Sequence, residues 1–105
     1  MLGALEQLVL LAILRAGKNA YGVTIADEIE EHAGRTVTLA TIYKTLTRLE
    51  EKEFVRSRAG EPTAVRGGKA KRYYALTAEG RQELQSALNA LQRMARRLDL
   101  GLEKQ

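Results

Sequence analysis

The chain has 105 residues, with 17 Lys and Arg against 13 Asp and Glu and a net charge of +4. This length is typical of one domain, and the 45% hydrophobic content indicates a globular fold rather than a disordered chain. The absence of Cys excludes disulfides, thiolate metal sites and cysteine nucleophiles. The longest apolar run, residues 8–14, is much shorter than the roughly 20 residues of a membrane span, so we expect a cytoplasmic protein without membrane association.

Two helices are expected in the first third of the chain. Apolar residues from Leu2 to Ala12 recur at helical spacing, and Gly17 follows as a left-handed stop. Because this segment is apolar nearly all round, we expect it to be the most buried helix. A second helix is expected over residues 21–33, and its acidic outer face makes it a poor element for contact with DNA. Its inner face is predicted to consist of Ile25, Ile29 and Ala33.

The third helix has clearer signals at its start and along its faces. Thr38 is a suitable N-cap, because its hydroxyl can accept from a backbone N–H of the first turn. The exposed first two turns lack acids, which appear only from Glu50 onward, the reverse of what the helix macrodipole favours. Something other than the macrodipole therefore selects the exposed N-terminal face. The inner stripe is predicted to consist of Leu39, Ile42, Leu46 and Leu49.

A basic hairpin is expected after the third helix. Residues 54–58 and 72–76 are predicted to pair as two strands with a long tip. The window 56–72 holds six basic residues and one acid and carries +5, so the rest of the chain sums to −1. Such localised charge is typical of a polyanion contact. Of Tyr73 and Tyr74, one is expected to pack on the core and the other to face the basic side, because successive strand side chains alternate.

The final helix is predicted to begin at Ala78, with Thr77 as its cap, and to continue to Leu102. Apolar residues alternately three and four apart form a stripe along it. A monomer would leave much of this stripe in water, so a two-fold partner is expected to bury it. The predicted dimer interface joins the stripe to the first helix and comprises Leu2, Leu5, Leu84, Leu88, Leu91, Ala95, Leu98 and Leu102.

Few residues could form a metal or catalytic site. The single His, His32, follows Glu28 by one turn in the acidic second helix, and we expect a structural surface role rather than metal binding. The stretch 66–69 superficially resembles a phosphate loop, but Thr63 and Ala70 break the Walker pattern. We therefore expect no enzymatic activity, no metal and no cofactor.

The order of the helices and the hairpin favours a helix-turn-helix with a basic wing. In that motif the second helix of the pair places its N-terminal residues at base edges in the major groove. The hairpin would add phosphate contacts, which supply most of the affinity of such proteins. On the third helix, the candidates for DNA contact are Thr38, Ala40, Thr41, Tyr43, Lys44, Thr47 and Arg48.

Three stretches then match a known family in order and spacing: AYGVTI at 20–25, TLATIYKTLTRLE at 38–50 and RGGKAKRYYALTAEG at 66–80. In these stretches the chain resembles the PadR family of winged-helix transcriptional regulators, in its small form with one C-terminal helix. The resemblance implies a mostly α fold with a small β-hairpin. It implies a winged helix-turn-helix DNA-binding domain over residues 1–77 and a C-terminal dimerisation helix over 78–105, in one compact unit.

The resemblance also implies a homodimeric bacterial regulator, most often a repressor, that binds double-stranded DNA. Two-fold symmetry would require a pseudo-palindromic operator. Similar small members sit beside transporter genes, so a transporter operon is the expected target. Many members respond to a small-molecule effector, but the last helix has no aromatic residue, so we assign no effector site and leave a possible effector unidentified. Together with the basic residues of the hairpin, the resemblance gives the wing candidates Arg66, Gly67, Gly68, Lys69, Lys71, Arg72, Tyr73 and Tyr74.

Three other functions remain open from the sequence. The runner-up is a winged-helix protein-interaction module whose hairpin binds an acidic protein partner. A small nucleic-acid-binding enzyme subunit is disfavoured because no catalytic cluster is present. RNA binding is disfavoured because no aromatic stacking platform lies across a sheet. The acid-free start of the third helix favours duplex DNA.

Overall fold

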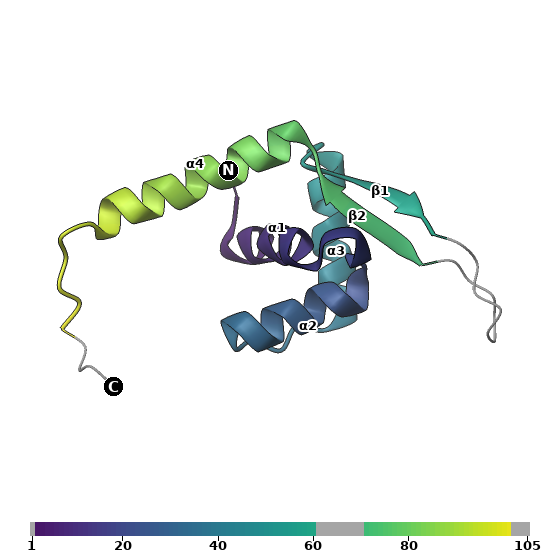
Figure 1. Cartoon of the computed structure of the whole chain (residues 1–105), viewed down its shortest axis with the longest axis horizontal. Helices are drawn as coiled ribbons and strands as arrows, with labels where there is room; N and C mark the ends of the chain where they lie inside the picture. The colour runs from purple at the N-terminus through teal and green to yellow at the C-terminus, as the bar shows by residue number, and fades with distance from the viewer. Residues whose placement is uncertain (1, 61–70, 102–105) are drawn as a thin grey trace.

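The computed structural model describes residues 2–60 and 71–101. In Figure 1, three helices form a body, a hairpin extends from one side of it, and the last helix extends to the other side. This arrangement confirms the predicted fold class. In chain order the elements are α1 (Ala4–Ala16), the 3-10 turn η1 (Gly17–Asn19), α2 (Gly22–Ala33), α3 (Leu39–Glu51), β1 (Val55–Ala59), β2 (Arg72–Leu76) and α4 (Ala78–Ala95).

The core of the body is one cluster of aliphatic side chains shared by the three helices. Val9 and Leu10 of α1 are fully buried, as are Ile25 of α2 and Ile42 of α3. The burial of α1 is not uniform around its axis, since Leu14 is 38% exposed. The first helix therefore supplies much of the core, but one side of it remains open.

The two helix-ending glycines adopt different conformations. Gly34 ends α2 in the left-handed helical region, with φ 67° and ψ 24°. Gly17 ends α1 with φ 62° but ψ −129°, so it is not the left-handed helical stop that the sequence suggested. Both values of φ are positive, which glycine adopts readily because it has no Cβ.

Two predicted caps are confirmed. The Thr38 hydroxyl accepts from the backbone N–H of Thr41 at 3.2 Å, at the start of α3. The Thr77 hydroxyl accepts from the N–H of Gly80 at 3.0 Å, at the start of α4. Each hydroxyl satisfies a backbone donor that the helix itself cannot pair.

Two residues predicted for inner helix faces are exposed instead. Leu39 in the first turn of α3 is 43% exposed, and Ala33 at the end of α2 is exposed. They lie at the two ends of the connection 34–38, most of which is exposed, so little packs over them. On α3, Thr45 is buried instead of Leu39, and its hydroxyl donates to the carbonyl of Thr41 at 2.8 Å.

The two strands pair antiparallel, with Val55 opposite Leu76 and Ala59 opposite Arg72. The first strand therefore begins one residue later than predicted, and the second has the predicted bounds. On its other edge, β2 is held by the segment before α2. There the N–H of Tyr74 donates to the carbonyl of Ala20 at 2.9 Å.

The first half of α4 belongs to the body. The Thr77 hydroxyl donates to the carbonyl of Glu53 at 2.7 Å, and a Cβ on Gly80 would overlap the carbonyl oxygen of Phe54. Leu84 is 3% exposed and lies in the core cluster, and Leu88 packs partly against it. The predicted division between residues 77 and 78 stays a prediction, although the helix does begin there.

The second half of α4 departs from the prediction. The helix ends at Ala95 rather than at Leu102, which lies outside the described residues. Arg96 leaves the helix with ψ 133°, and Arg97 has φ 64°. Residues 91–101 are all exposed, so the last turn has little support beyond its own backbone bonds. None of the helices within the described residues is long and apolar enough to cross a membrane.

Candidate nucleic-acid interface

The exposed face of α3 gathers polar and basic side chains on successive turns. Thr38, Thr41, Lys44 and Thr47 are all exposed, as the sequence predicted. A shallow hollow runs along this face, and its only acid is Glu51 at the end of the helix. The hollow is lined by Ala40, Tyr43, Lys44, Thr47, Arg48 and Glu51. This face can therefore donate hydrogen bonds along most of its length.

The Tyr43 side chain lies on this face and approaches α2 closely. Its side chain is 44% exposed, and a Cβ on Gly22 would overlap the Tyr43 hydroxyl and ring. Glycine at position 22 therefore leaves the space that the Tyr43 ring occupies. This packing orients an aromatic ring and a hydroxyl on the exposed face of α3.

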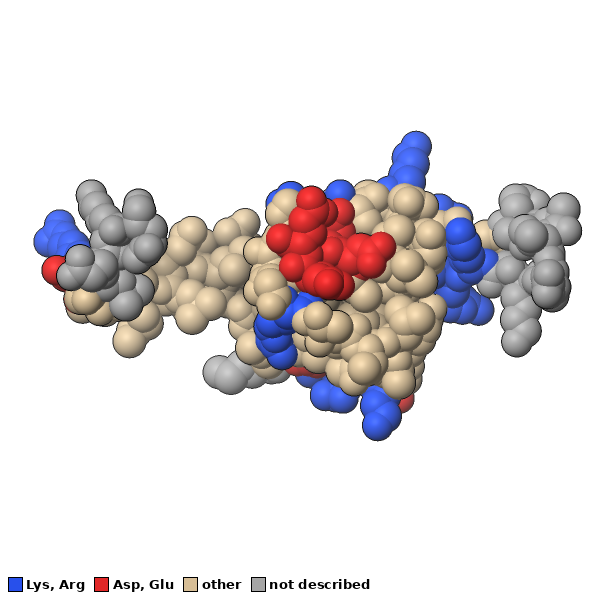
Figure 2. Space-filling view, turned by 90° about the horizontal axis from the view of Figure 1, so that it is seen from below, with Lys and Arg blue, Asp and Glu red and all other residues tan. Residues whose placement is uncertain are grey.

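The exposed face of α2 has the opposite charge. Asp27, Glu30 and Glu31 are exposed on it, and Glu28 is partly buried. Figure 2 shows the acidic side chains gathered in one patch, with Lys and Arg around its margin and beside the hairpin. This separation of charge agrees with the expectation that α2 supports α3 and does not itself face DNA.

The wing residues fall into two groups. Arg66, Gly67, Gly68 and Lys69 lie outside the described residues, so the tip of the wing stays a prediction. Lys71 and Arg72 are exposed, Tyr73 is half-buried, and Tyr74 is 8% exposed within the core. The prediction that one Tyr packs on the core is confirmed.

Tyr74 therefore offers little surface for the DNA contact that was predicted for it, since its ring packs in the core. Burial raises the pKa of its hydroxyl above the ordinary value, with a further increase from Glu50 and an opposing effect of Arg72.

Arg72 joins the hairpin to α3 through a short hydrogen-bond chain. Its Nη1 donates to Ser57 Oγ at 3.0 Å, and Ser57 Oγ donates to Glu50 Oε2 at 2.8 Å. All of these groups are exposed enough to exchange partners with solvent or a ligand. The chain links the wing to the C-terminal half of the helix that carries the proposed base contacts.

The hairpin also carries cations that were not among the predicted DNA-contact residues. Between α1, the hairpin and the start of α4 lies an open hollow of about 400 Å³, with no acid among its lining residues. Its basic residues are Lys18, Arg56, Arg58 and Arg81. Tyr21, at the start of α2, was also missed as a candidate; the only signal was its place in the AYGVTI stretch.

A buried carboxylate of α1 pairs with an exposed lysine at the end of α3. Glu6 of α1 is 6% exposed, and its Oε2 accepts from Lys52 Nζ at 2.8 Å at the end of α3. Its other oxygen accepts from the N–H of Gly3 at 2.8 Å. Burial alone would raise the pKa of Glu6, but these two donors, with the charge of Arg48 nearby, lower the pKa below its ordinary value.

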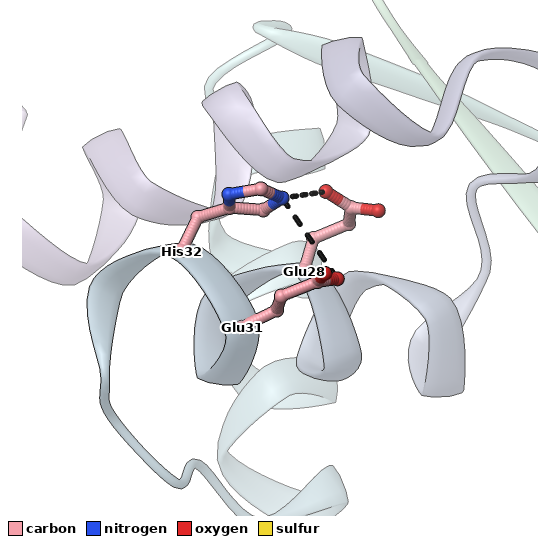
Figure 3. A group of neighbouring side chains, drawn as sticks. All are labelled: Glu28, Glu31 and His32. Atoms are coloured by element: carbon pink, nitrogen blue, oxygen red, sulfur yellow. Dashed lines mark ion pairs between the residues drawn. The ribbon is translucent and has the colours of Figure 1, made fainter.

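His32 meets two carboxylates on the surface of α2 (Figure 3). Its Nε2 lies 3.5 Å from Glu28 and 3.8 Å from Glu31, while Arg15 lies 2.9 Å from the same nitrogen. Arg15 also donates to Glu28 at 3.0 Å. The guanidinium occupies the place that a cation would take, so the cluster is an exposed ion-pair network and fits the structural role expected for His32.

The residues predicted for a dimer interface separate into buried and exposed groups. Leu2 and Leu84 are buried within the single chain, at 7% and 3% exposure, so they offer little surface to a partner. Leu5 and Leu88 are partly buried against the core. The exposed members are Ala95, Leu91 and Leu98, and the structure adds Met94 and Leu100 to them.

Several known proteins are similar to this chain. A PadR family transcription regulator from hypervirulent Clostridium difficile R20291 has a TM-score of 0.72 at 25% identity, over 88% of this chain and 91% of that one. Bacillus subtilis PadR, solved in complex with operator DNA, has a TM-score of 0.68 at 25% identity, over 97% of this chain but 53% of its own. An uncharacterized protein of Lysinibacillus sphaericus is 29% identical over 96% of this chain and 90% of its own length.

The sequence profile of the transcriptional regulator PadR-like family matches residues 10–86. The match extends from α1 to the first half of α4 and contains the whole of α2, α3 and the hairpin. Because it covers most of the chain, the protein belongs to the PadR-like family of transcriptional regulators.

Proposed function

We propose that this chain is a homodimeric, sequence-specific DNA-binding repressor that acts in the cytoplasm. Members of its family are transcription regulators and not enzymes. The observation that carries the proposal is the exposed face of α3, which is polar and basic along its first turns and adjoins a basic hairpin. The resemblance to small PadR-like regulators extends the proposal to a transporter operon as the target.

In this proposal the two DNA-facing elements have different tasks. Thr41, Lys44 and Thr47 on α3 contact base edges, because the recognition helix of this motif enters the major groove. Lys71 and Arg72 of the wing contact phosphates, which supply affinity without sequence information. Bacillus subtilis PadR, whose structure contains operator DNA and matches 97% of this chain, supports the proposal that the chain binds DNA.

The proposal of a dimer rests on the distal half of α4. Leu91 is 57% exposed, Met94 77% and Leu98 63%, and no other described element packs over them. A second copy of the same surface would remove these side chains from water, at about 25 cal/mol for each Å² of apolar area. A two-fold partner would also place two recognition helices about one DNA turn apart, or a multiple of it.

DNA binding is tested by a salt titration with a mixed-sequence duplex and with DNA from the protein's own upstream region. Lys44→Ala should change preference among operator variants by about 1–3 kcal/mol at one base position. Lys71→Ala with Arg72→Ala should weaken binding to all sequences and lower the salt slope by about one unit per lost contact. Arg93→Ala removes an exposed cation of α4 and is the matched control. It should change neither the operator preference nor the affinity and salt slope.

Equal loss of affinity for operator and random DNA in Lys44→Ala would assign this residue to the backbone. A wild-type protein that ignores duplex DNA at low salt but binds an acidic protein would replace the proposal by the interaction-module function.

The dimer is tested by light scattering at micromolar concentration. Leu91→Asp with Leu98→Asp should give monomer or aggregate and abolish specific DNA binding. The charge-matched control, Gln82→Asp with Gln92→Asp, alters two exposed polar positions of α4 and should remain dimeric. A monomeric wild-type protein that binds one asymmetric half-site would contradict this part of the proposal.

A further inference from the structure

Four side chains form an alternating aromatic and cationic cluster where the wing leaves the body. The rings of Tyr21 and Tyr73 meet edge to face, with centroids 5.6 Å apart and planes at 80°. Lys71 Nζ lies 4.3 Å from the centroid of Tyr21, and the guanidinium carbon of Arg58 lies 4.8 Å from that of Tyr73. Each cation therefore lies over one ring, within the distance of a cation–π contact.

The surrounding backbone encloses the Tyr73 ring. A Cβ on Gly60 would overlap this ring, so glycine at the end of the pairing leaves room for it. The N–H of Gly60 donates to the carbonyl of Lys71 at 2.7 Å, which joins the two arms of the hairpin beside this ring. The ring thus lies between the root of the wing and Tyr21.

Tyr21 also lies where three elements meet. It is the residue that precedes α2, and the adjacent Ala20 carbonyl accepts from the N–H of Tyr74 in β2. The next residue, Gly22, is the one against which the Tyr43 ring of α3 packs. Three consecutive residues, 20–22, therefore touch β2, the base of the wing and the exposed face of α3.

We propose that Tyr21 is a positioning residue that fixes the wing relative to the recognition helix and holds Lys71 ready for a phosphate. The inference rests on the proposed DNA binding. A lysine side chain loses rotamer freedom when it pairs with a phosphate. A ring under one side of the ammonium restricts that freedom in advance and leaves its other side open, since Lys71 is exposed.

The test compares Tyr21→Phe with Tyr21→Leu. Phenylalanine keeps the ring and removes the hydroxyl, whereas leucine removes the ring and stays apolar. With a mixed-sequence duplex at low salt, Tyr21→Phe should bind as the wild type does. Tyr21→Leu should bind about two- to fivefold more weakly, a ratio in the range expected when one long side chain must be ordered on binding instead of in advance.

A double-mutant cycle separates positioning from a general structural effect. Lys71→Ala should weaken DNA binding by the same factor in the wild type and in Tyr21→Phe, and by a smaller factor in Tyr21→Leu. In the free protein, the ring current of Tyr21 should shift the Lys71 CεH₂ proton resonances upfield in the wild type and in Tyr21→Phe, and Tyr21→Leu should abolish the shift. This spectrum also shows whether the variant is folded.

An equal effect of Lys71→Ala in all three backgrounds would overturn the proposal, even if Tyr21→Leu binds weakly. If Tyr21→Leu fails to fold, the spectrum of the wild-type protein tests the proposal. Lys71 CεH₂ resonances without an upfield shift would then overturn it. A wild-type protein that does not bind DNA would instead show that the proposed function fails, and with it this inference.

Discussion

Most large aliphatic side chains of the winged-helix body are buried, whereas those in the distal half of α4 are exposed. Ile25, Ile42 and Leu46 are fully enclosed, while Leu91 is 57% and Met94 77% exposed. Both regions contain similar residue types at helical spacing. The difference teaches that the body completes its core within one chain, while the distal half of α4 offers apolar surface suited to an intermolecular contact.

The largest loss of stability in the body is expected from a substitution where α4 meets the hairpin. In Gly80→Ala the new Cβ overlaps the carbonyl oxygen of Phe54, which is backbone and cannot rotate away. We expect a loss of about 3 kcal/mol or more in the free energy of unfolding, measured by urea denaturation. In the control Gly3→Ala the nearest atom is 3.7 Å away, and the loss should stay within about 1 kcal/mol. Equal losses in the two variants would contradict this packing.

A smaller effect is expected from the ion pair between Glu6 of α1, which is buried, and Lys52 at the end of α3. Glu6→Gln should lower the free energy of unfolding by about 1.5–3 kcal/mol near neutral pH, because it removes hydrogen bonds to a buried charge. The folded-state pKa of Glu6 is lowered, so its stabilisation is present above the unfolded pKa and is lost as the pH falls through the folded pKa.

The difference between wild type and Glu6→Gln should therefore narrow in acid, below about pH 4. Urea denaturation over a pH series checks this, and Asp27→Asn, at an exposed acid of α2, serves as the control. A difference that stays constant into acid would show that the charge of Glu6 is not what stabilises the fold.

Gly22→Ala should lower the stability only slightly but disturb the orientation of Tyr43 on the exposed face of α3. The overlap here is with the ring and hydroxyl of Tyr43, a side chain that can rotate. We expect a loss of only about 1 kcal/mol in stability, together with weaker discrimination between operator and random DNA. Adding Tyr43→Ala should restore the stability but not the discrimination. A loss as large as that in Gly80→Ala would show that Tyr43 cannot move.

The smallest effect on the body is expected in the distal half of α4. Leu91→Ser with Met94→Ser should change the unfolding free energy of the dilute protein by less than about 0.5 kcal/mol, because both side chains are exposed. The wild-type melting temperature should rise with protein concentration, and that of the variant should not. If the variant lost stability in the dilute limit, the distal half would belong to the body after all.

The parts of the fold that depend on local chemistry could be predicted from the sequence. Thr38 and Thr77 cap helices because a hydroxyl before a helix satisfies a free N–H, which requires no knowledge of distant residues. The second strand and the exposed face of α3 followed from strand alternation and helical spacing in the same way.

The sequence was a poorer guide where packing between distant residues decides which side chains are buried. The heptad-like spacing placed Leu84 in one stripe with Leu91, although the first packs into the core and only the second is exposed. Tyr74 was grouped with Tyr73 as a DNA contact, and only the partners of the strand show which of the two is buried. Tyr21 was missed because its contacts come from residues about 50 positions away along the chain.

The hydrogen bond between Tyr74 and Ala20 has a consequence for solubility. A two-stranded sheet has two open edges, each of which can recruit a strand from another molecule. On β2 the segment before α2 covers part of one edge. On β1 the exposed side chains of Arg56 and Arg58 bring positive charge to the other. Two hairpins that meet edge to edge would therefore repel each other, which protects the proposed DNA-binding wing against amyloid-like stacking.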